Sequence, residues 1–357
     1  MITLIYPYRN RSIGRVRNSL ESLTGQSNKD FQVEFIDYGS EPSLAGEVKE
    51  LVTSYSFSNY TYSNTQYQLW NKSRALNIII KNLHTDYCFV SDVDMIFAPN
   101  FIETLHKVKN PNAATYFQVG YLSKEESEKN VPFKEYKTKF LSTSEATGLT
   151  LFPTSKLKEL NGFDEFFHLW GAEDTDMHHR LRNNGVQIKY FDNDLLMVHQ
   201  WHISFVGKKK KDYTRDFVLT DIELLNHEHK DKNHNMKVTQ VNPDGWGKRV
   251  TKSEFMELND HPIDVFLTNQ TKDINHLLHS LLPSKSANLL SVEINDSKEF
   301  SMKRSLKKFL GKRVNLFYSM KKVNDLVLMQ LIAHYRNKNY IYQVSENAEK
   351  ITLKIKL

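Results

Sequence analysis

Short apolar runs alternate with amphipathic stretches over the first quarter of the chain. The apolar runs, which are typical of buried strands, are Ile2–Tyr6, Gln32–Ile36 and Tyr87–Val90. The stretches between them have helical signals and cover Ile13–Leu23, Pro42–Tyr55 and Asn71–Leu83. Strands that alternate with helices predict a parallel α/β sheet, in which ligands bind beyond the carboxyl ends of the strands. Three carboxylates lie at such ends, namely Asp37, Asp92 and Asp94.

A second alternation begins after Val250. Its predicted elements are a strand at His261–Leu267, a helix at Ile274–Leu282, a strand at Ala287–Ile294, a basic helix at Met302–Leu310, a strand at Val314–Tyr318, a helix at Val323–Tyr335, and a hairpin of Tyr340–Val344 with Ile351–Ile355. This order predicts a second, smaller α/β domain. We therefore expect one domain at residues 1–235, a connector at 236–260 and an accessory domain at 261–357.

The composition is that of an ordinary globular protein. The chain has 357 residues, of which 39% are hydrophobic and 25% charged, so it is large enough for two domains. Its one cysteine, Cys88, lies in an apolar run and cannot form a disulfide within the chain. We find no apolar run long enough for a signal peptide or a membrane span. These features predict a cytoplasmic protein.

The net charge of +6 favours anionic partners, which could be nucleotides, anionic lipids or nucleic acid. Nucleic acid is the weakest of the three, because the chain has no sequence signature of a nucleic-acid-binding module. The run Lys208–Lys211 fits a solvated surface, and it could also touch a diphosphate or the inner face of an anionic membrane. We therefore expect no nucleic acid as partner and leave peripheral membrane contact open.

The Asp92-Val93-Asp94 turn is the first candidate for chemistry. The chain contains neither a G-x-G-x-x-G nor a Walker A pattern, which argues against dehydrogenases and P-loop ATPases. Carboxylates at a strand end can instead hold Mg²⁺ or Mn²⁺, which in turn binds a diphosphate. Alone, the turn could equally be an exposed acidic loop.

Two histidines strengthen the metal interpretation. His199 and His202 follow the apolar run Leu195–Val198, and a turn can direct both imidazoles toward one ion. Imidazole combined with carboxylate suits Mn²⁺ or Zn²⁺ better than Ca²⁺. Both could be surface residues, but together with Asp92 and Asp94 they predict a metal site.

The stretch Asn161–Asp176 contains five acidic residues, two glycines and Trp170, and a helix is expected to continue from its end. Asp174, Thr175 and Asp176 could simply cap that helix. A cap does not require Trp-Gly before Glu-Asp, so we favour a functional site.

In this order, Asp92-Val93-Asp94, the Trp170–Asp176 motif and the His199/His202 pair resemble GT-A glycosyltransferases. The chain resembles a bacterial family-2 glycosyltransferase with a galactosyltransferase-type C-terminal half. Weaker support comes from Tyr6–Arg11, from Asp37–Ser40 and from Trp70–Asn77, which is similar to the Asn-Arg-Ala-x-x-Leu-Asn element of the family. The resemblance covers residues 1 to about 205 and implies a GT-A-type α/β fold with a mostly parallel central sheet.

The resemblance implies roles for individual residues. Asp94 and His202 would bind the metal, and His199 stands where β-1,4-galactosyltransferases have a methionine ligand, which favours Mn²⁺ or a similar ion, with Mg²⁺ as the alternative. The implied donor-binding residues are Pro7, Tyr8, Arg9, Asp37, Lys72, Arg74 and Asp92. Asp174 would be the catalytic base, while Glu173 and Trp170 would bind the acceptor sugar.

The implied activity is an inverting, metal-dependent transfer from a UDP-sugar of the Gal, GalNAc, Glc or GlcNAc type. The acceptor would be a hydroxyl of a glycan or lipid-linked glycan, in the synthesis of a surface polysaccharide. A segment from Ile203 to Lys211 would close over the donor. The group His227, His229 and His234 is interpreted as surface.

Two other functions remain open. The chain could be a sugar-nucleotide or glycan-binding protein that has the fold without turnover. A metal-dependent phosphohydrolase is less favoured, because such sites need more ligands around two metals.

Overall fold

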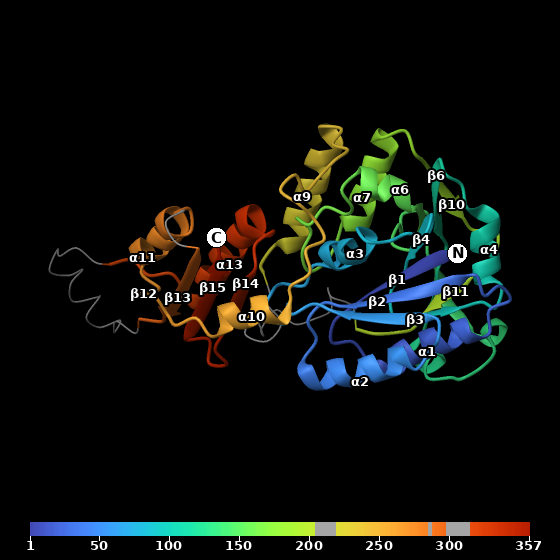
Figure 1. Ribbon diagram of the computed structural model, residues 1–357, viewed down its shortest axis with the longest axis horizontal. Helices are drawn as coiled ribbons and strands as arrows, with labels where there is room; N and C mark the ends of the chain where they lie inside the picture. Colours follow the sequence, from blue (N-terminus) through green and yellow to red (C-terminus); the bar gives the residue numbers. More distant parts are fainter. Residues whose placement is uncertain (204–218, 285–287, 298–314) are drawn as a thin grey trace. The chain divides into compact units, whose positions relative to one another are not determined.

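The computed structural model describes residues 1–203, 219–284, 288–297 and 315–357, and the chain divides into two compact units (Figure 1). Of the described residues, the first unit comprises Met1–Gln66, residues 70–203 and Glu223–Arg249. The second comprises Tyr67–Leu69, residues 219–222 and Val250–Leu357. The predicted closing segment after Ile203, the lysine run and the basic helix at 302–310 lie outside the described residues.

A seven-stranded sheet forms the centre of the first unit, in the order β10-β6-β9-β4-β1-β2-β3. Its strands are β1 (Ile2–Tyr8), β2 (Phe31–Asp37), β3 (Ser58–Tyr62), β4 (Tyr87–Val90), β6 (Ala113–Phe117), β9 (Thr150–Pro153) and β10 (Gln187–Phe191). All neighbours pair in parallel except β9, which is antiparallel to β4 and β6. The predicted strands are confirmed, whereas β3 was missed because its Ser-Asn-Tyr-Thr-Tyr sequence is polar and only half-buried.

Helices cover both faces of this sheet. The helices are α1 (Ile13–Thr24), α2 (Pro42–Thr53), α3 (Lys72–Ile80), α4 (Phe101–Val108), α6 (Thr154–Glu159) and α7 (Glu173–Asn183). Alternate residues of β1 enter different cores, because successive side chains of a strand point to opposite faces. Leu4 packs with α1, α2 and α4, whereas Ile5 packs with α3, α6 and α7. The single cysteine, Cys88, is fully buried in the second of these cores.

A smaller sheet lies in the same unit, in the order β5-β11-β7-β8. It consists of β5 (Met95–Phe97), β11 (Met197–His199), β7 (Gly120–Leu122) and β8 (Thr138–Leu141), with the short elements α5 (Lys124–Ser127) and η1 (Phe133–Glu135) nearby in sequence. β11 is antiparallel to β5, and His199 pairs with Met95. Strand β11 thus contains the second half of the apolar run Leu195–Val198 and continues to His199. This pairing places a histidine beside the residue that follows Asp94.

The second unit has its own four-stranded sheet, in the order β12-β13-β15-β14. Its elements are α10 (Lys252–Asn259), β12 (Val265–Thr268), α11 (Thr271–His276), η2 (Leu277–Leu281), β13 (Leu289–Asn295), α13 (Met320–Gln330), η3 (Leu331–Tyr335), β14 (Tyr340–Val344) and β15 (Lys350–Lys356). The predicted hairpin is confirmed as the antiparallel pair β14 and β15. The prediction of an α/β fold with a mostly parallel central sheet and a second, smaller α/β unit is thus confirmed.

Residues of the expected connector are found in both units. Trp246 packs against the core beneath α3, and the Asn242 amide nitrogen donates to the Phe163 carbonyl at 2.8 Å, so this part belongs to the first unit. Helix α10 belongs to the second. The domain limits themselves stay a prediction.

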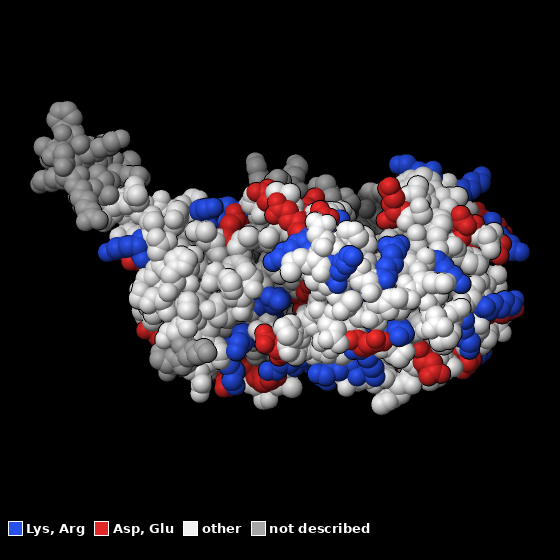
Figure 2. All heavy atoms as spheres, turned by 90° about the horizontal axis from the view of Figure 1, so that it is seen from above, with Lys and Arg blue, Asp and Glu red and all other residues white. Residues whose placement is uncertain are grey.

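The charged side chains on one face of the surface are mixed in sign. On the face that Figure 2 shows, basic and acidic side chains are interspersed, so the positive net charge does not gather in one patch there. Within the described residues, every helix is too short or too polar to cross a bilayer.

Candidate active site

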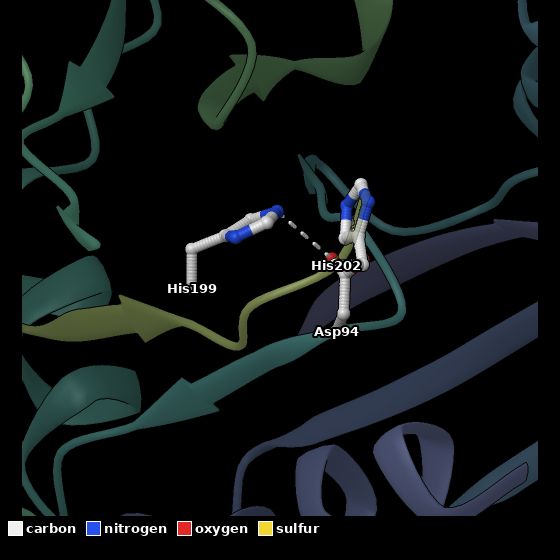
Figure 3. Close-up of side chains that lie close together, drawn as sticks. All are labelled: Asp94, His199 and His202. Carbon is white, nitrogen blue, oxygen red and sulfur yellow. Dashed lines mark ion pairs between the residues drawn. The ribbon is translucent and has the colours of Figure 1, made fainter. Parts of the chain in front are cut away.

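Asp94, His199 and His202 form a compact group of metal-ligand type in the first unit. Asp94 lies in the turn between β4 and β5, His199 ends β11, and His202 follows three residues later. The Asp94 Oδ2 atom is 3.2 Å from His202 Nε2, and Oδ1 is 3.5 Å from His199 Nε2. All three ligand atoms lie within 4.8 Å of one another, and the side chains converge from two strand ends (Figure 3).

The surroundings of Asp94 suit a cation. Burial acts to raise the pKa of this carboxyl, but the hydrogen bond with His202 and the two imidazoles outweigh burial and lower the pKa. The same hydrogen bond raises the pKa of His202. Asp94 Oδ1 is buried and has no hydrogen-bond partner among the described residues, which is unusual for a carboxylate oxygen. A divalent ion would satisfy that oxygen.

One imidazole is oriented for metal binding. His202 Nδ1 lies 2.9 Å from the carbonyl oxygen of Ile203, which can only accept a hydrogen bond. In the protonated ring Nδ1 donates to Ile203 and Nε2 donates to Asp94. In the neutral ring the proton stays on Nδ1, and the Nε2 lone pair is then available to an ion. Carboxylate plus two imidazoles is a donor set that fits Mn²⁺ or Zn²⁺.

A second cluster gathers three carboxylates around Lys72. The Lys72 ammonium lies 3.1 Å from Asp174 Oδ2, 3.3 Å from Glu173 Oε1 and 3.7 Å from Asp92 Oδ1. Lys72 begins α3, Asp92 follows β4, and the other two acids begin α7. Because Asp92 and Asp94 are two residues apart, the Asp-Val-Asp turn contributes one carboxylate to each group. The two groups are therefore adjacent.

Asp174 has the environment of a general base. Burial raises the pKa of Asp174 to about 7, with Glu173 and Asp92 acting in the same direction and Lys72 opposing them. A base with a pKa near the working pH is well matched to proton transfer. A side chain at Gly148 would place its Cβ 3.1 Å from Asp174 Oδ2, so the absence of a side chain there leaves room beside the carboxylate.

The turn before α7 is held in an uncommon conformation. Leu169, Gly171 and Ala172 all have positive φ, at 62°, 101° and 72°. Ala172 is the residue before the first helical position, and no side chain caps the helix. Asp176 instead pairs with the buried Arg180 at 2.7 Å. The acidic run therefore does not cap the helix by a side-chain hydrogen bond, although Glu173, Asp174 and Asp176 in the first turn do complement the helix dipole.

Helix α9 (Ile222–Asn235) contributes residues that the sequence analysis missed. The Asn226 amide donates to the carbonyl oxygens of His168 and Trp170, at 3.0 and 2.8 Å. Asn233 donates to Asp164 and to Asp176. Residues 226, 229 and 233 lie on one face of a helix, and that spacing was the signal that could have revealed them.

His229 corrects an expectation. Its Nε2 lies 2.8 Å from Asp164 Oδ2, and its ring stacks on Phe166 with the ring centres 3.7 Å apart. Burial would raise the pKa of Asp164, but His229 outweighs burial and lowers the pKa to about 2. The interpretation of His229 as a surface residue is wrong, since this histidine anchors the loop that leads to Trp170.

The predicted acceptor residues begin α7 or precede it. The Trp170 side chain is 47% exposed, although the backbone on both sides of it is bonded to α9. Glu173 lies next to Asp174 and faces Lys72. Contact of the acceptor with Trp170 or Glu173 stays a prediction.

Most of the predicted donor residues are bonded within the protein. The carboxylate of Asp37 is fully buried and accepts from the Ser40 amide at 2.8 Å and the Tyr60 hydroxyl at 2.9 Å. Arg74 is 1% exposed, and its Nε donates to the Lys248 carbonyl at 3.0 Å. The remaining members show the same pattern: Pro7 lies in β1, the Tyr8 hydroxyl donates to the Arg11 carbonyl, and Arg9 donates to the Gln66 carbonyl. Only Lys72 and Asp92 of this set join the carboxylate cluster, and donor contact stays a prediction.

Comparison with solved structures finds several glycosyltransferases. TarS from S. aureus, residues 1–349, has 16% identity and a TM-score of 0.41 over 56% of this chain and 60% of that chain. Mannosyltransferase PcManGT from Pyrobaculum calidifontis, in complex with GDP-Man and Mn²⁺, has 16% identity and a TM-score of 0.42 over 58% of each chain. GalNAc-T7 with UDP, GalNAc and Mn²⁺ has 13% identity and a TM-score of 0.46 over 72% of this chain and 56% of that chain.

The alignments thus span between 56% and 60% of the length of these three proteins. No curated protein sequence matches the chain. Residues 130–202 match a family model described as the N-terminal domain of galactosyltransferase. The matched stretch includes the Trp170–Asp176 motif, Asp174 and both metal-ligand histidines. Over this stretch, the resemblance to galactosyltransferases is confirmed.

Proposed function

We propose that this protein is an inverting, divalent-metal-dependent glycosyltransferase. It moves a sugar from a UDP-sugar to a hydroxyl of a glycan or lipid-linked glycan, in the synthesis of a surface polysaccharide. The observation on which the proposal rests is that one short turn contributes Asp94 to a metal-ligand group and Asp92 to a cluster containing a base of raised pKa. The galactosyltransferase match over residues 130–202 supports this reaction class.

Asp94, His199 and His202 would hold the metal, and Mn²⁺ is one of the ions that fit this donor set. When bound, the ion stabilises the negative charge that develops on the leaving diphosphate. The orphaned Oδ1 atom of Asp94 supports this assignment, because the described protein groups leave it unsatisfied.

Asp174 would act on the acceptor. Its carboxylate takes the proton of the acceptor hydroxyl while that oxygen forms a bond to the anomeric carbon of the donor sugar. The bond between the anomeric carbon and the diphosphate breaks, and its electron pair leaves with UDP. Direct displacement from the opposite face inverts the anomeric centre. Glu173 would accept hydrogen bonds from the acceptor sugar, and the exposed Trp170 ring would stack on it.

Calorimetric titration tests the donor site. A panel of nucleotide sugars is titrated into the wild type and Asp94→Ala, with and without Mn²⁺. We expect one UDP-sugar to bind only when both Mn²⁺ and Asp94 are present. Absence of nucleotide binding under every condition would overturn the proposal.

A sugar-nucleotide or glycan-binding protein without turnover is the second candidate. Asp174→Asn separates the two. A transferase loses turnover and keeps metal-dependent nucleotide binding, whereas a binding protein shows no turnover before or after the change.

A further inference from the structure

We propose that Lys72 is a positioning residue for the base: its ammonium links Asp174 on the acceptor side to Asp92 on the donor side and keeps Asp174 in its ionised, proton-accepting form. The inference rests on the proposed function and adds to it. The family resemblance implies only contact between this residue and the nucleotide, whereas the structure places it among carboxylates.

The position of Lys72 is fixed by its surroundings. It is the first residue of α3, directly after the N-cap Asn71. The Asn71 side chain accepts from the Arg74 amide at 2.7 Å and donates to the Glu165 carbonyl at 2.8 Å. The end of α3 is therefore bonded to the same loop that leads to Asp174. The backbone from which the Lys72 side chain starts is thus held in place, and only the side chain itself is ordered when it forms its three contacts.

The charges in the cluster require a cation. Among the described residues, the charged groups that act most strongly on Asp174 are Lys72 from α3, Glu173 from α7 and Asp92 from the turn after β4. Three ionised carboxylates and one ammonium carry a net charge of −2, and without Lys72 the cluster would hold −3. Like charges at this separation disfavour ionisation, so the first group to take up a proton would be Asp174, whose pKa is already raised.

The pKa of Lys72 agrees with its place among the carboxylates. Burial lowers the pKa of its ammonium, but Asp174, Asp92 and Glu173 outweigh burial and raise the pKa well above its ordinary range. Lys72 is thus a permanent cation at neutral pH. Since Asp174 already has a pKa of about 7, loss of that cation would leave the base mostly protonated at neutral pH.

The first test measures kcat against pH for Lys72→Met and Lys72→Arg. We expect the acid limb of the profile to move up by about one to three pH units in Lys72→Met, which corresponds to a loss of roughly fivefold to five-hundredfold at pH 7. Lys72→Arg retains the cation and should keep a profile close to that of the wild type. Lys81→Met makes the same chemical change at the C-terminal end of the same helix, where Lys81 donates to the Trp246 carbonyl, and serves as the control.

The second test does not depend on turnover. A raised pKa in the folded state means that ionised Asp174 costs stability, so the free energy of unfolding falls as pH rises from about 4 to about 7. Subtracting the curve of Asp174→Asn isolates this dependence. In Lys72→Met the fall should continue above pH 7, to about pH 8 or beyond. If Lys72→Met does not fold, Lys72→Gln provides the same comparison.

An acid limb and an unfolding curve that Lys72→Met leaves unchanged would overturn the inference, and a loss of UDP binding alone would assign Lys72 to the donor only. If the wild type shows no transfer with any sugar, the proposed function fails. The unfolding curves still decide whether Lys72 controls the ionisation of Asp174.

Discussion

Asp94 is buried and Asp174 is half-buried, and their surroundings shift their ionisation in opposite directions. Imidazoles lower the pKa of Asp94, whereas burial and neighbouring carboxylates raise that of Asp174 to about 7. A carboxylate that stays charged suits a cation, and one that exchanges protons near neutral pH suits a base. Burial acts to raise the pKa of both carboxyls, and the partners decide whether that effect is overcome, as at Asp94, or persists, as at Asp174.

The change with the largest expected effect is Asp174→Asn, which tests whether Asp174 is the base. The amide cannot accept the acceptor proton, so we expect kcat to fall by about 10²–10⁴. The Asp94 group is untouched, so Mn²⁺-dependent UDP-sugar binding should be within a factor of two or so of the wild type. Steady-state kinetics and calorimetry check both halves. Equal loss of binding would show that the two groups do not act separately.

His202→Ala tests the metal-ligand group around Asp94. It removes a predicted metal ligand and leaves the buried Asp94 with His199 alone, whose Nε2 is farther from the carboxylate (3.5 Å) than that of His202 (3.2 Å). Replacing an outer-shell partner of a metal ligand costs about 10- to 100-fold in affinity, and loss of a ligand should cost at least as much. Mn²⁺ affinity can be measured by electron paramagnetic resonance of the free ion. His234→Ala, a histidine on α9 outside the proposed ligand set, is the matched control, and unchanged affinity in His202→Ala would contradict the assignment.

Asp164 sharpens the comparison, because it is another buried carboxylate and has a histidine partner but no second one. His229→Ala should destabilise the fold by roughly 2–4 kcal/mol, since it leaves a buried charge with fewer partners. Urea unfolding measures this. The pKa of Asp164 is lowered to about 2, so its share of stability is present above about pH 4 and is lost as pH falls toward 2. His229→Ala should lose that acid dependence, and Mn²⁺ affinity should not change.

Asn226→Ala has the smallest expected effect of these changes. It removes two hydrogen bonds to the backbone of the Trp170 turn, worth about 1–2 kcal/mol together. The turn should loosen, so KM for the acceptor should rise more than KM for the donor. Separate kinetics for the two substrates test this, with Asn235→Ala at the other end of the helix as a control.

The sequence predicted the parts of the molecule that local patterns determine. The alternation of strands and helices placed Asp92 and Asp94 at a strand end. The spacing of His199 and His202 indicated that both imidazoles bind the same metal ion. The contacts of Lys72 were not predictable in the same way, because they join α3, the turn after β4 and α7, which are distant in sequence. The bond between His229 and Asp164 was missed for the same reason, since it spans 65 residues.

The left-handed turn before α7 has a consequence for the evolution of this chain. Leu169 and Ala172 adopt a backbone conformation that disfavours any residue with a Cβ atom by roughly 1 kcal/mol each, and glycine would relieve that strain. Variants selected only for resistance to heat should therefore accept glycine at either position. Variants selected for turnover should resist it, because a freer backbone would no longer hold the indole of Trp170 at a fixed angle. The two selections, run in parallel on one library, would separate stability from activity at single positions.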